Sequence, residues 1–315
     1  MTDFAMQYGD HVTRARRDGR PVVALESTIV SHGLPRPDNL RVAREIEQAV
    51  RDNGAVPATI GMIGGELIVG LSDQQIEHLA GADDVAKLSV RDLAVAAATG
   101  AHGATTVAAT SAVAVAAGLR VFATGGLGGV HREASATYDE SADLTTLART
   151  PIVVVCAGVK SILDVGATLE RLETLGVAVA GYRTRRFPGF FVTDGGFDVD
   201  WALESPGQVA EAIRARDEQG VSTAALILAN PLPAEEQLDP ALHDRTLAEG
   251  LRQLAAHGIT GKAVTPFLLS HFHSATDGQS LAVNIRIILR NAALAARIAV
   301  AAAPAPAPLG FSVPR

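Results

Sequence analysis

Residues 151–182 read PIVVVCAGVKSILDVGATLERLETLGVAVAGY, and this stretch decides the fold class. It opens with a continuous apolar run, 151–158, which is typical of a strand that is buried on both faces of a sheet. Residues 161–176 then follow the pattern of a helix, and residues 177–182 return to that of a strand. Strand, helix and strand in this order predict two parallel strands joined by a crossover helix.

The same alternation continues on both sides of this stretch. On the N-terminal side we expect strand 21–30, loop 31–37, a helix from its N-cap Asp38 to Gly54, hairpin 58–71 around Gly64 and Gly65, strand 86–90, helix 91–100, strand 104–109, helix 111–118 and strand 119–126. On the C-terminal side we expect strand 222–233 and helices at about 240–257, 263–275 and 279–302. These segments predict an α/β fold, in which helices cover both faces of a mostly parallel or mixed sheet. Residues 1–302 are expected to form one domain and the Pro-rich tail 303–315 to be mobile.

Composition excludes several classes of protein. The 315-residue chain has a net charge of −7 and no basic stripe, which argues against binding to a nucleic-acid backbone. The arginines between residues 14 and 20 are interpreted as a solvated helix face. One cysteine excludes an intramolecular disulfide framework, and the N-terminus lacks a signal-peptide pattern, so we expect a cytoplasmic protein. Residues 93–119 carry no formal charge, but their Gly, Thr, Ser and His content favours burial inside the fold over a membrane span.

Lysine is scarce in this sequence. Of 27 Lys plus Arg residues, only Lys87, Lys160 and Lys262 are lysine, which leaves 24 arginines. A lysine is required where a neutral amine must form, because an arginine side chain is not deprotonated in proteins. Lys160 follows an apolar strand that could lower its pKa by desolvation. At the start of a helix it would also oppose the helix dipole, so Lys160 is a candidate nucleophile. Lys262 is interpreted as an ordinary residue at a helix start.

Other polar residues lie at junctions between predicted elements. Glu26 ends a strand and is either a satisfied structural carboxylate or a working one. The glycine-rich stretch 123–132, ATGGLGGVHR, is interpreted as a tight turn rather than a nucleotide-binding loop. Asp139, Glu140 and Asp143 form an acidic cluster, which is either a solvated loop or a site for a hard cation held partly through water. Cys156, inside an apolar strand, is interpreted as a core residue.

Several of these motifs together resemble the pseudouridine-5'-phosphate glycosidase family, which includes the related domain once called indigoidine synthase A. The matching stretches run in order from about residue 22 to residue 300: ALESTIVSHGLPRPDNL, PATIGMIGG, GATTVAAT, VFATGGLGGVHR, SADL, VVVCAGVKSILD, TLERLETLGV, ANPLP, TPFLL and NIRIILRNAALAARIA. The resemblance implies a homotrimer of three-layer α/β/α sandwiches. It also implies reversible cleavage of the C–C glycosidic bond of pseudouridine 5'-phosphate, giving uracil and ribose 5-phosphate, with a divalent metal, usually Mn²⁺.

The resemblance also implies roles for particular residues. Lys160 would be the nucleophile that forms an imine-type adduct at ribose C1', and Glu26 would be the proton donor. Asp139 would hold the metal largely through water. The sugar phosphate would contact Lys87, the backbone near Val107, and the run Ser141, Ala142 and Asp143, while Asn284 would read the uracil edge. Two residues depart from the family pattern, Val90 in the strand of Lys87 and Glu140 beside Asp139.

Two other functions are compatible with parts of this pattern. Lys160 and Lys87 alone would also serve a Schiff-base aldolase or lyase that acts on another sugar phosphate. The glycine turn alone would serve a non-enzymatic sensor of nucleotide phosphates. Asn284 and Glu26 favour the glycosidase, because only that reaction needs both a uracil reader and an acid on the side of the base.

Overall fold

The computed structural model describes residues 5–259 and 264–303 of the chain. Its core is a run of parallel strands in the spatial order β3-β2-β7-β8-β13-β9-β12. The bounds of these strands are Val56–Ile63 (β3), Val22–Leu25 (β2), Val121–Ala123 (β7), Val153–Cys156 (β8), Leu226–Ala229 (β13), Ala178–Tyr182 (β9) and Trp201–Leu203 (β12). Within residues 151–182, β8 and β9 run parallel as predicted, although β13 lies between them and pairs with both.

The N-terminal edge of the sheet is mixed. β4 (Glu66–Val69) forms an antiparallel hairpin with β3, and Gly64 and Gly65 in its turn have φ angles of +57° and +85°. Two residues with positive φ define the type of turn that glycine favours, so the predicted hairpin is confirmed. The remaining strands at this edge are β1 (Gln7–Tyr8), β5 (Ala86–Leu88) and β6 (Gly103–Thr105). The fold is therefore α/β with a mixed, mostly parallel sheet, as predicted.

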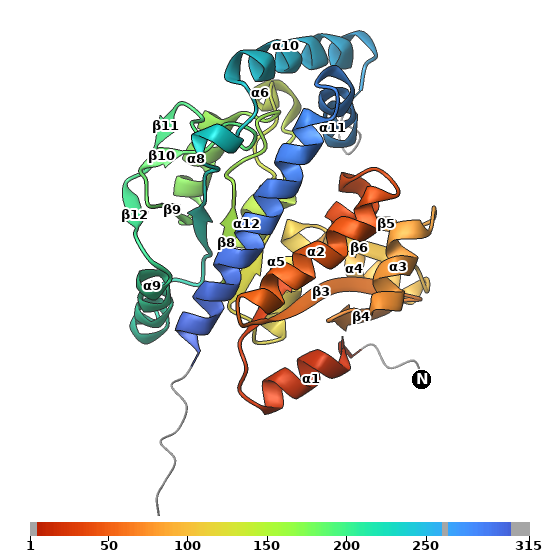
Figure 1. Ribbon diagram of the computed structural model, residues 1–315, viewed down its shortest axis with the longest axis vertical. Helices are drawn as coiled ribbons and strands as arrows, with labels where there is room; N and C mark the ends of the chain where they lie inside the picture. The colour runs from red at the N-terminus through yellow and green to blue at the C-terminus, as the bar shows by residue number, and fades with distance from the viewer. Residues whose placement is uncertain (1–4, 260–263, 304–315) are drawn as a thin grey trace, which may run out of the picture.

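Helices cover both faces of the sheet. On one face α12 (Gln279–Ala302) runs diagonally between α2 (Asp38–Asp52) and α9 (Pro206–Gln219), as Figure 1 shows. The other face is covered by α1 (Asp10–Arg17), α5 (Val107–Ala116), α7 (Ala142–Leu147) and α8 (Val165–Thr174). In β8, Val153 and Val155 pack towards α12 while Val154 and Cys156 pack towards the other layer. Burial on both faces explains why this strand is an unbroken apolar run.

A third group of elements lies at one end of the sandwich. Helices α10 (Pro240–Ala256) and α11 (Val264–Ala275) pack together at the top of Figure 1. Below them β10 (Arg186–Phe187) and β11 (Phe197–Asp198) form a separate two-stranded sheet. Three buried phenylalanines, Phe187, Phe190 and Phe191, join these segments to the loop that follows β8.

Several predicted boundaries are wrong. The strand expected at 21–30 ends at Leu25, and residues Ile29–Gly33 form a π-helical turn, η1. The strand expected at 104–109 ends at Thr105, because Thr106 caps α5 and the helix takes up the β-branched residues that follow. The helix expected from residue 161 begins at Val165, with Asp164 as its N-cap. Asp38 is the first helical residue of α2 rather than its cap.

The expected helix 91–100 is shorter than predicted, and some elements were not anticipated. Residues Val90–Asp92 form a 3₁₀ turn (η2), and α4 spans Leu93–Ala98. Four helices had not been expected: α3 (Asp73–Gly81), α6 (Ala134–Thr137), and the helices α7 and α9 described above. In the described part of the chain, no helix has both the length and the apolar character that a membrane crossing requires. Lys262 and most of the predicted mobile tail, residues 304–315, lie outside the described residues.

Candidate active site

The candidate active site lies where three neighbouring parallel strands end. Glu26 follows β2 directly, Thr124 follows β7, and Lys160 lies four residues beyond β8. Carboxyl ends of adjacent parallel strands meet at one edge of a sheet, which is where α/β proteins place their ligand sites. Here Glu26 and Lys160, together with Lys87 from β5, line one cavity of about 370 Å³.

Glu26 is the carboxyl group at the base of this cavity. It is partly buried, and the Thr124 hydroxyl donates a hydrogen bond to its Oε1. Burial raises the pKa of Glu26 above its ordinary value, while the positive charge of Lys160 and the Thr124 hydrogen bond act in the opposite direction. A carboxyl group whose protonated form is favoured in this way is suited to act as a proton donor.

Lys160 lies in a turn between β8 and α8. Its backbone N–H donates to the Leu127 carbonyl at 3.2 Å, and its own carbonyl accepts from the N–H of Leu163 at 2.9 Å. Because α8 begins only at Val165, Lys160 is not at a helix start as expected, and its charge does not oppose a helix dipole there. Cys156, earlier in the same segment, is fully buried, which raises the pKa of its thiol to about 12 and confirms it as a core residue.

Backbone amides form a second part of the cavity wall. The carboxylate of Asp143 accepts from the amide of Ala108 at 2.9 Å and from that of Gly128 at 2.8 Å, so it joins the start of α5 to the glycine-rich turn. The Ser141 hydroxyl caps α7 by accepting from the amide of Asp143 at 3.2 Å. Asp143 and Ser141 thus have structural partners as well as lining the cavity.

Two amides remain available beside these caps. Among the described residues, the N–H groups of Val107 and Ala142 have no acceptor, and both residues line the cavity with Lys87. The start of a helix with unpaired amides favours anions, and a lysine adds a full positive charge. This wall of the cavity therefore suits a phosphate group.

Gly128 allows the two caps to approach each other. A Cβ atom at this position would lie 2.3 Å from Ser141 Oγ and 2.7 Å from Asp143 Oδ2. No side chain fits at that distance, so the glycine-rich turn serves a close approach of backbone and side chains, as the sequence analysis interpreted it.

Asp139 lines the same cavity and is partly exposed. His131 Nδ1 is 3.8 Å from Asp139 Oδ2, and the neighbouring Glu140 forms an ion pair with Arg171 at 2.9 Å. No group of three or more metal-ligating side chains occurs in the part of the chain that the structure describes. Asp139 therefore fits a divalent cation only in the way hard ions such as Mg²⁺ are held, through one carboxylate with water in the other positions. The carboxylate of the neighbouring Glu140 is ion-paired with Arg171 and is not assigned to the cation.

Asn284 lies in an adjoining cavity, on the side of α12. This second cavity shares Glu26, Lys87 and Lys160 with the first. Its wall also includes His32, Phe190 and Asn284. Asn284 is buried, and its Oδ1 would lie 3.6 Å from a Cβ atom at Gly125. A carboxamide opposite an aromatic ring is suited to the edge and face of a planar heterocycle.

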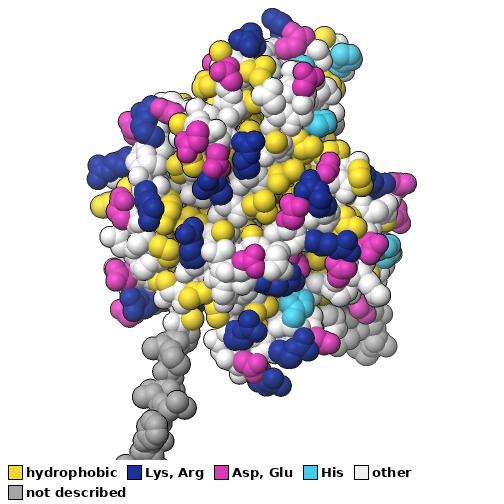
Figure 2. Space-filling model, viewed as in Figure 1, with side chains coloured by type: hydrophobic (Ala, Val, Ile, Leu, Met, Phe, Trp, Pro, Cys, Tyr) yellow, Lys and Arg dark blue, Asp and Glu magenta, His cyan; other side chains and the backbone are white. Residues whose placement is uncertain are grey.

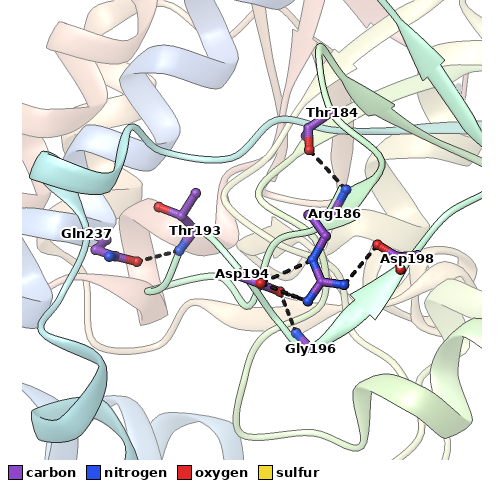
Figure 3. A network of polar contacts seen from close by, with 7 residues as sticks. All are labelled: Thr184, Arg186, Thr193, Asp194, Gly196, Asp198 and Gln237. Atoms are coloured by element: carbon purple, nitrogen blue, oxygen red, sulfur yellow. Dashed lines mark hydrogen bonds and ion pairs between the residues drawn. The ribbon is translucent and has the colours of Figure 1, made fainter.

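Phe190 is held in the second cavity by a loop with a polar network of its own. Figure 3 shows Arg186 bound to Asp194 and Asp198, and the amide of Thr193 donating to Gln237 Oε1 at 2.8 Å. These contacts stabilise the loop that carries Phe190. Phe190 has a φ angle of +64°, and its backbone N–H donates a hydrogen bond to the Ala157 carbonyl at 3.2 Å.

The sequence-predicted site residues converge in space. One cavity brings together Glu26, Lys87, Val107, Asp139, Ser141, Ala142, Asp143 and Lys160, and Asn284 lies in the cavity that adjoins it. The roles assigned to these residues remain predictions. Sequence reasoning missed Thr124, His32 and Phe190. Thr124 lies within the glycine-rich stretch already singled out, whereas no pattern identified His32 or Phe190.

Comparison with known proteins places this site in a family. The family model described as "Indigoidine synthase A like protein" matches residues 11–301. A protein of Salinispora tropica named pseudouridine-5'-phosphate glycosidase is 76% identical over 303 residues, which cover 96% of this chain and 94% of that protein. A protein of Saccharopolyspora erythraea with the same name is 58% identical over 292 residues, covering 93% of this chain and 96% of the relative.

Two solved structures share the fold. The prealnumycin C-glycosynthase AlnA, in complex with ribulose 5-phosphate, aligns with a TM-score of 0.87 and 38% identity, covering 96% of this chain and 98% of that one. An indigoidine synthase A-like protein of Thermotoga maritima aligns with a TM-score of 0.85 and 33% identity, covering 95% of this chain and 97% of that one.

Proposed function

This chain belongs to the family of indigoidine synthase A like proteins, and on that premise we propose that it is a pseudouridine-5'-phosphate glycosidase. The reaction is the reversible cleavage of the C–C glycosidic bond of pseudouridine 5'-phosphate to uracil and ribose 5-phosphate. Relatives of that name that are 58% and 76% identical support this proposal. A structural neighbour named as a C-glycosynthase, with a pentose 5-phosphate bound, supports C–C bond chemistry on such sugars.

The observation that carries the proposal is the shared cavity of Glu26 and Lys160. An ordinary glycosidase places two carboxylates across the bond and expels a heteroatom. In pseudouridine the leaving atom is carbon C5 of uracil, a much poorer leaving group. A lysine bound to the sugar as an imine offers the electron sink that such a cleavage needs. An amine and a carboxyl group whose pKa is raised by burial lie in one cavity, which supports this chemistry.

The proposed mechanism assigns one bond change to each of these residues. The Lys160 amine forms a bond to C1' as the C1'–O4' bond breaks and opens the sugar ring, and O4' takes up the proton that the amine nitrogen gives up. Its nitrogen lone pair then forms the C1'=N bond as the electron pair of the C1'–C5 bond goes to C5, which takes a proton from Glu26. Water hydrolyses the imine and releases ribose 5-phosphate. Lys87 and the amides of Val107 and Ala142 would bind the phosphate, beside the run Ser141 to Asp143, and Asn284 would bind the uracil edge.

The remaining parts of the proposal concern the metal and the assembly. A divalent metal, with Mn²⁺ as the expected ion, would be held by Asp139 largely through water and would supply positive charge beside the substrate. We also infer from the family resemblance that the enzyme is a cytoplasmic homotrimer.

The proposal is tested by incubating the protein with pseudouridine 5'-phosphate and Mn²⁺ and measuring free uracil by liquid chromatography. We expect uracil and ribose 5-phosphate in equal amounts, and none with the Lys160→Ala variant. Cleavage of other sugar phosphates without uracil release would indicate the aldolase or lyase instead. Tight binding of nucleotide phosphates without turnover, unchanged in Lys160→Ala, would indicate the sensor.

A further inference from the structure

A chain of hydrogen bonds leads from Glu26 to two carboxamides that do not line either cavity, the buried Asn291 and the partly buried Asn230. Thr124 Oγ1 donates to Glu26, and the backbone carbonyl of Thr124 accepts from Asn291 Nδ2 at 2.8 Å. Asn291 Oδ1 in turn accepts from Asn230 Nδ2 at 2.9 Å. These contacts connect α12 and the end of β13 to the proton donor through a single residue, Thr124.

The backbone at Thr124 needs such an anchor. β7 ends at Ala123, and the next two residues are Gly125 and Gly126, which restrict the backbone least of all residues. Thr124 is fully buried, so its carbonyl oxygen has no water to bond with if Asn291 is lost. The N–H of Thr124 is held by Val155 O at 3.0 Å, and Asn291 Nδ2 holds the other side of the residue.

Asn230 fixes the orientation of the Asn291 amide. Asn291 is 1% exposed, and its Nδ2 also lies 3.4 Å from the Gly125 carbonyl. Because Asn230 donates to Asn291 Oδ1, the NH₂ group of Asn291 must point at the carbonyls of Thr124 and Gly125. The backbone N–H of Asn230 donates to the backbone carbonyl of Cys156 at 2.7 Å. This bond ties the Asn230–Asn291 pair to β8, the strand that leads to Lys160.

We propose that Asn291, oriented by Asn230, is a positioning residue that holds the Glu26 carboxyl in place through Thr124. The proposal depends on the function proposed above, since it treats Glu26 as the proton donor. Three charged groups also act on Glu26, namely Lys160, Lys87 and Asp143. The side chain of Asn291 is hydrogen-bonded to Asn230 and to the carbonyls of Thr124 and Gly125, so we expect changes at Asn291 to reach Glu26 through Thr124.

The test compares Asn291→Ala with Thr124→Val and with a control, Leu294→Ala. Leu294 is a buried core residue of the same helix that contributes to neither cavity. We expect Asn291→Ala to lower kcat for uracil release by about 10- to 100-fold while KM changes little, because the acid is displaced but the phosphate site is intact. The Leu294→Ala control is expected to lose stability and keep kcat.

A second measurement observes Glu26 directly. In protein labelled with [δ-¹³C]glutamate, the Glu26 resonance is assigned by its loss in Glu26→Gln and followed against pH. The Thr124 hydrogen bond favours the ionised carboxylate, so Asn291→Ala and Thr124→Val should both move the titration of Glu26 to higher pH. The double variant should move it no further than Thr124→Val alone, because both changes act on one contact.

The outcomes separate this inference from the proposed function. If the wild-type protein releases no uracil, the proposed function fails, and the titration of Glu26 still decides whether Asn291 positions it. A wild-type kcat and an unshifted titration in Asn291→Ala overturn the inference, as does an equal loss of kcat in Leu294→Ala. If Asn291→Ala does not fold, Asn230→Ala takes its place with a smaller expected shift in the same direction. An unshifted titration in Asn230→Ala would then overturn it.

Discussion

At Lys160 the difference between an amine and a guanidinium decides what the side chain can do. An arginine keeps the positive charge but has no accessible neutral form, so it cannot attack C1'. We expect Lys160→Arg to be nearly as inactive as Lys160→Ala. Borohydride added with ribose 5-phosphate should trap a mass adduct on Lys160, measured by peptide mass spectrometry. Substantial activity in the arginine variant, or an adduct on another residue of an active protein, would contradict the assignment.

Glu26 is predicted to destabilise the protein as the pH rises. Its pKa in the folded chain is raised above the ordinary value of 4.5, so the folded state holds this proton more tightly than the unfolded state. The stability contributed by the protonated form is complete below pH 4.5 and is lost as the pH rises through the folded-state pKa, with a limiting slope of about 1.4 kcal/mol per pH unit. Glu26→Gln removes this loss.

The free energy of unfolding in urea, measured for both proteins from about pH 5 to pH 8, checks this. The free energy of unfolding of Glu26→Gln should increase relative to that of the wild-type protein as the pH rises. Parallel curves for the two proteins would show that burial does not raise the pKa of Glu26.

Asp139 is expected to affect the metal and not the fold. Among the described residues, its carboxylate has one ion-pair partner, His131 at 3.8 Å, and its side chain is 36% exposed. Asp139→Ala should therefore raise the Mn²⁺ concentration needed for half-maximal uracil release, or abolish turnover, while the free energy of unfolding stays within about 0.5 kcal/mol of wild type. Activity measured across a Mn²⁺ titration tests this. An unchanged metal requirement would place the metal elsewhere.

Residue chemistry made some site residues predictable and left others hidden. Lys160 and Glu26 could be singled out because a charged residue is conspicuous next to an apolar strand. Their roles came from the resemblance to a family. Thr124 and Asn291 could not be found in this way, since a threonine or asparagine is unremarkable in a sequence, and their contacts join residues 167 positions apart.

Among the elements, α5 depends on a carboxylate from another helix. The Asp143 carboxylate in α7 accepts hydrogen bonds from the amides of Ala108 and Gly128, and its removal would take this acceptor from both amides. We expect Asp143→Ala to lower the free energy of unfolding by about 3 kcal/mol and to raise KM, because the start of α5 forms part of the phosphate wall. Urea unfolding and steady-state kinetics provide the two measurements.

Asp139→Ala is the matched control for this variant, because it removes a nearby carboxylate that accepts no amide from another element. If Asp143→Ala were as stable as Asp139→Ala, the carboxylate would not hold the two elements together.

Element boundaries were predictable only where a local signal outweighed tertiary contacts. The hairpin at Gly64 and Gly65 was predictable because the turn itself requires positive φ. The end of β2 was not, because Thr28, Ile29 and Val30 have strand propensity in isolation. In the fold Ser27 and Thr28 instead donate to the carbonyls of Ile60 and Thr105, and the chain turns into η1. Local propensity gives way there to hydrogen bonds with distant residues.

On the scale of the whole molecule, alternation of strands and helices was sufficient to predict an α/β sandwich. The order of the strands was not predictable, because the sequence does not show that β13 enters between β8 and β9. Figure 2 shows basic and acidic side chains interspersed over the visible face, in keeping with a modest net charge of −7. The surface in this view has no field of one sign that would attract a polyanion.

The assembly state is a prediction at this scale. The family resemblance implies a homotrimer, and Tyr138, next to Asp139, is 87% exposed in the single chain. Sedimentation equilibrium should give three times the chain mass of 32.6 kDa, unchanged on dilution through the micromolar range. A particle of one chain mass that retains full activity would show that the site is complete in a monomer.

The placement of lysines has a practical consequence for proteolysis. Both lysines in the described part of the chain, Lys87 and Lys160, lie in the cavity rather than on the outer surface. A protease that cleaves only after lysine has three sites in the whole sequence, and a reduced sugar adduct on Lys160 would remove one of them. The fragments 88–160 and 161–262 would then be replaced by a single fragment, 88–262. The presence of fragment 88–262 on a gel would therefore report that the sugar had been bound covalently to Lys160.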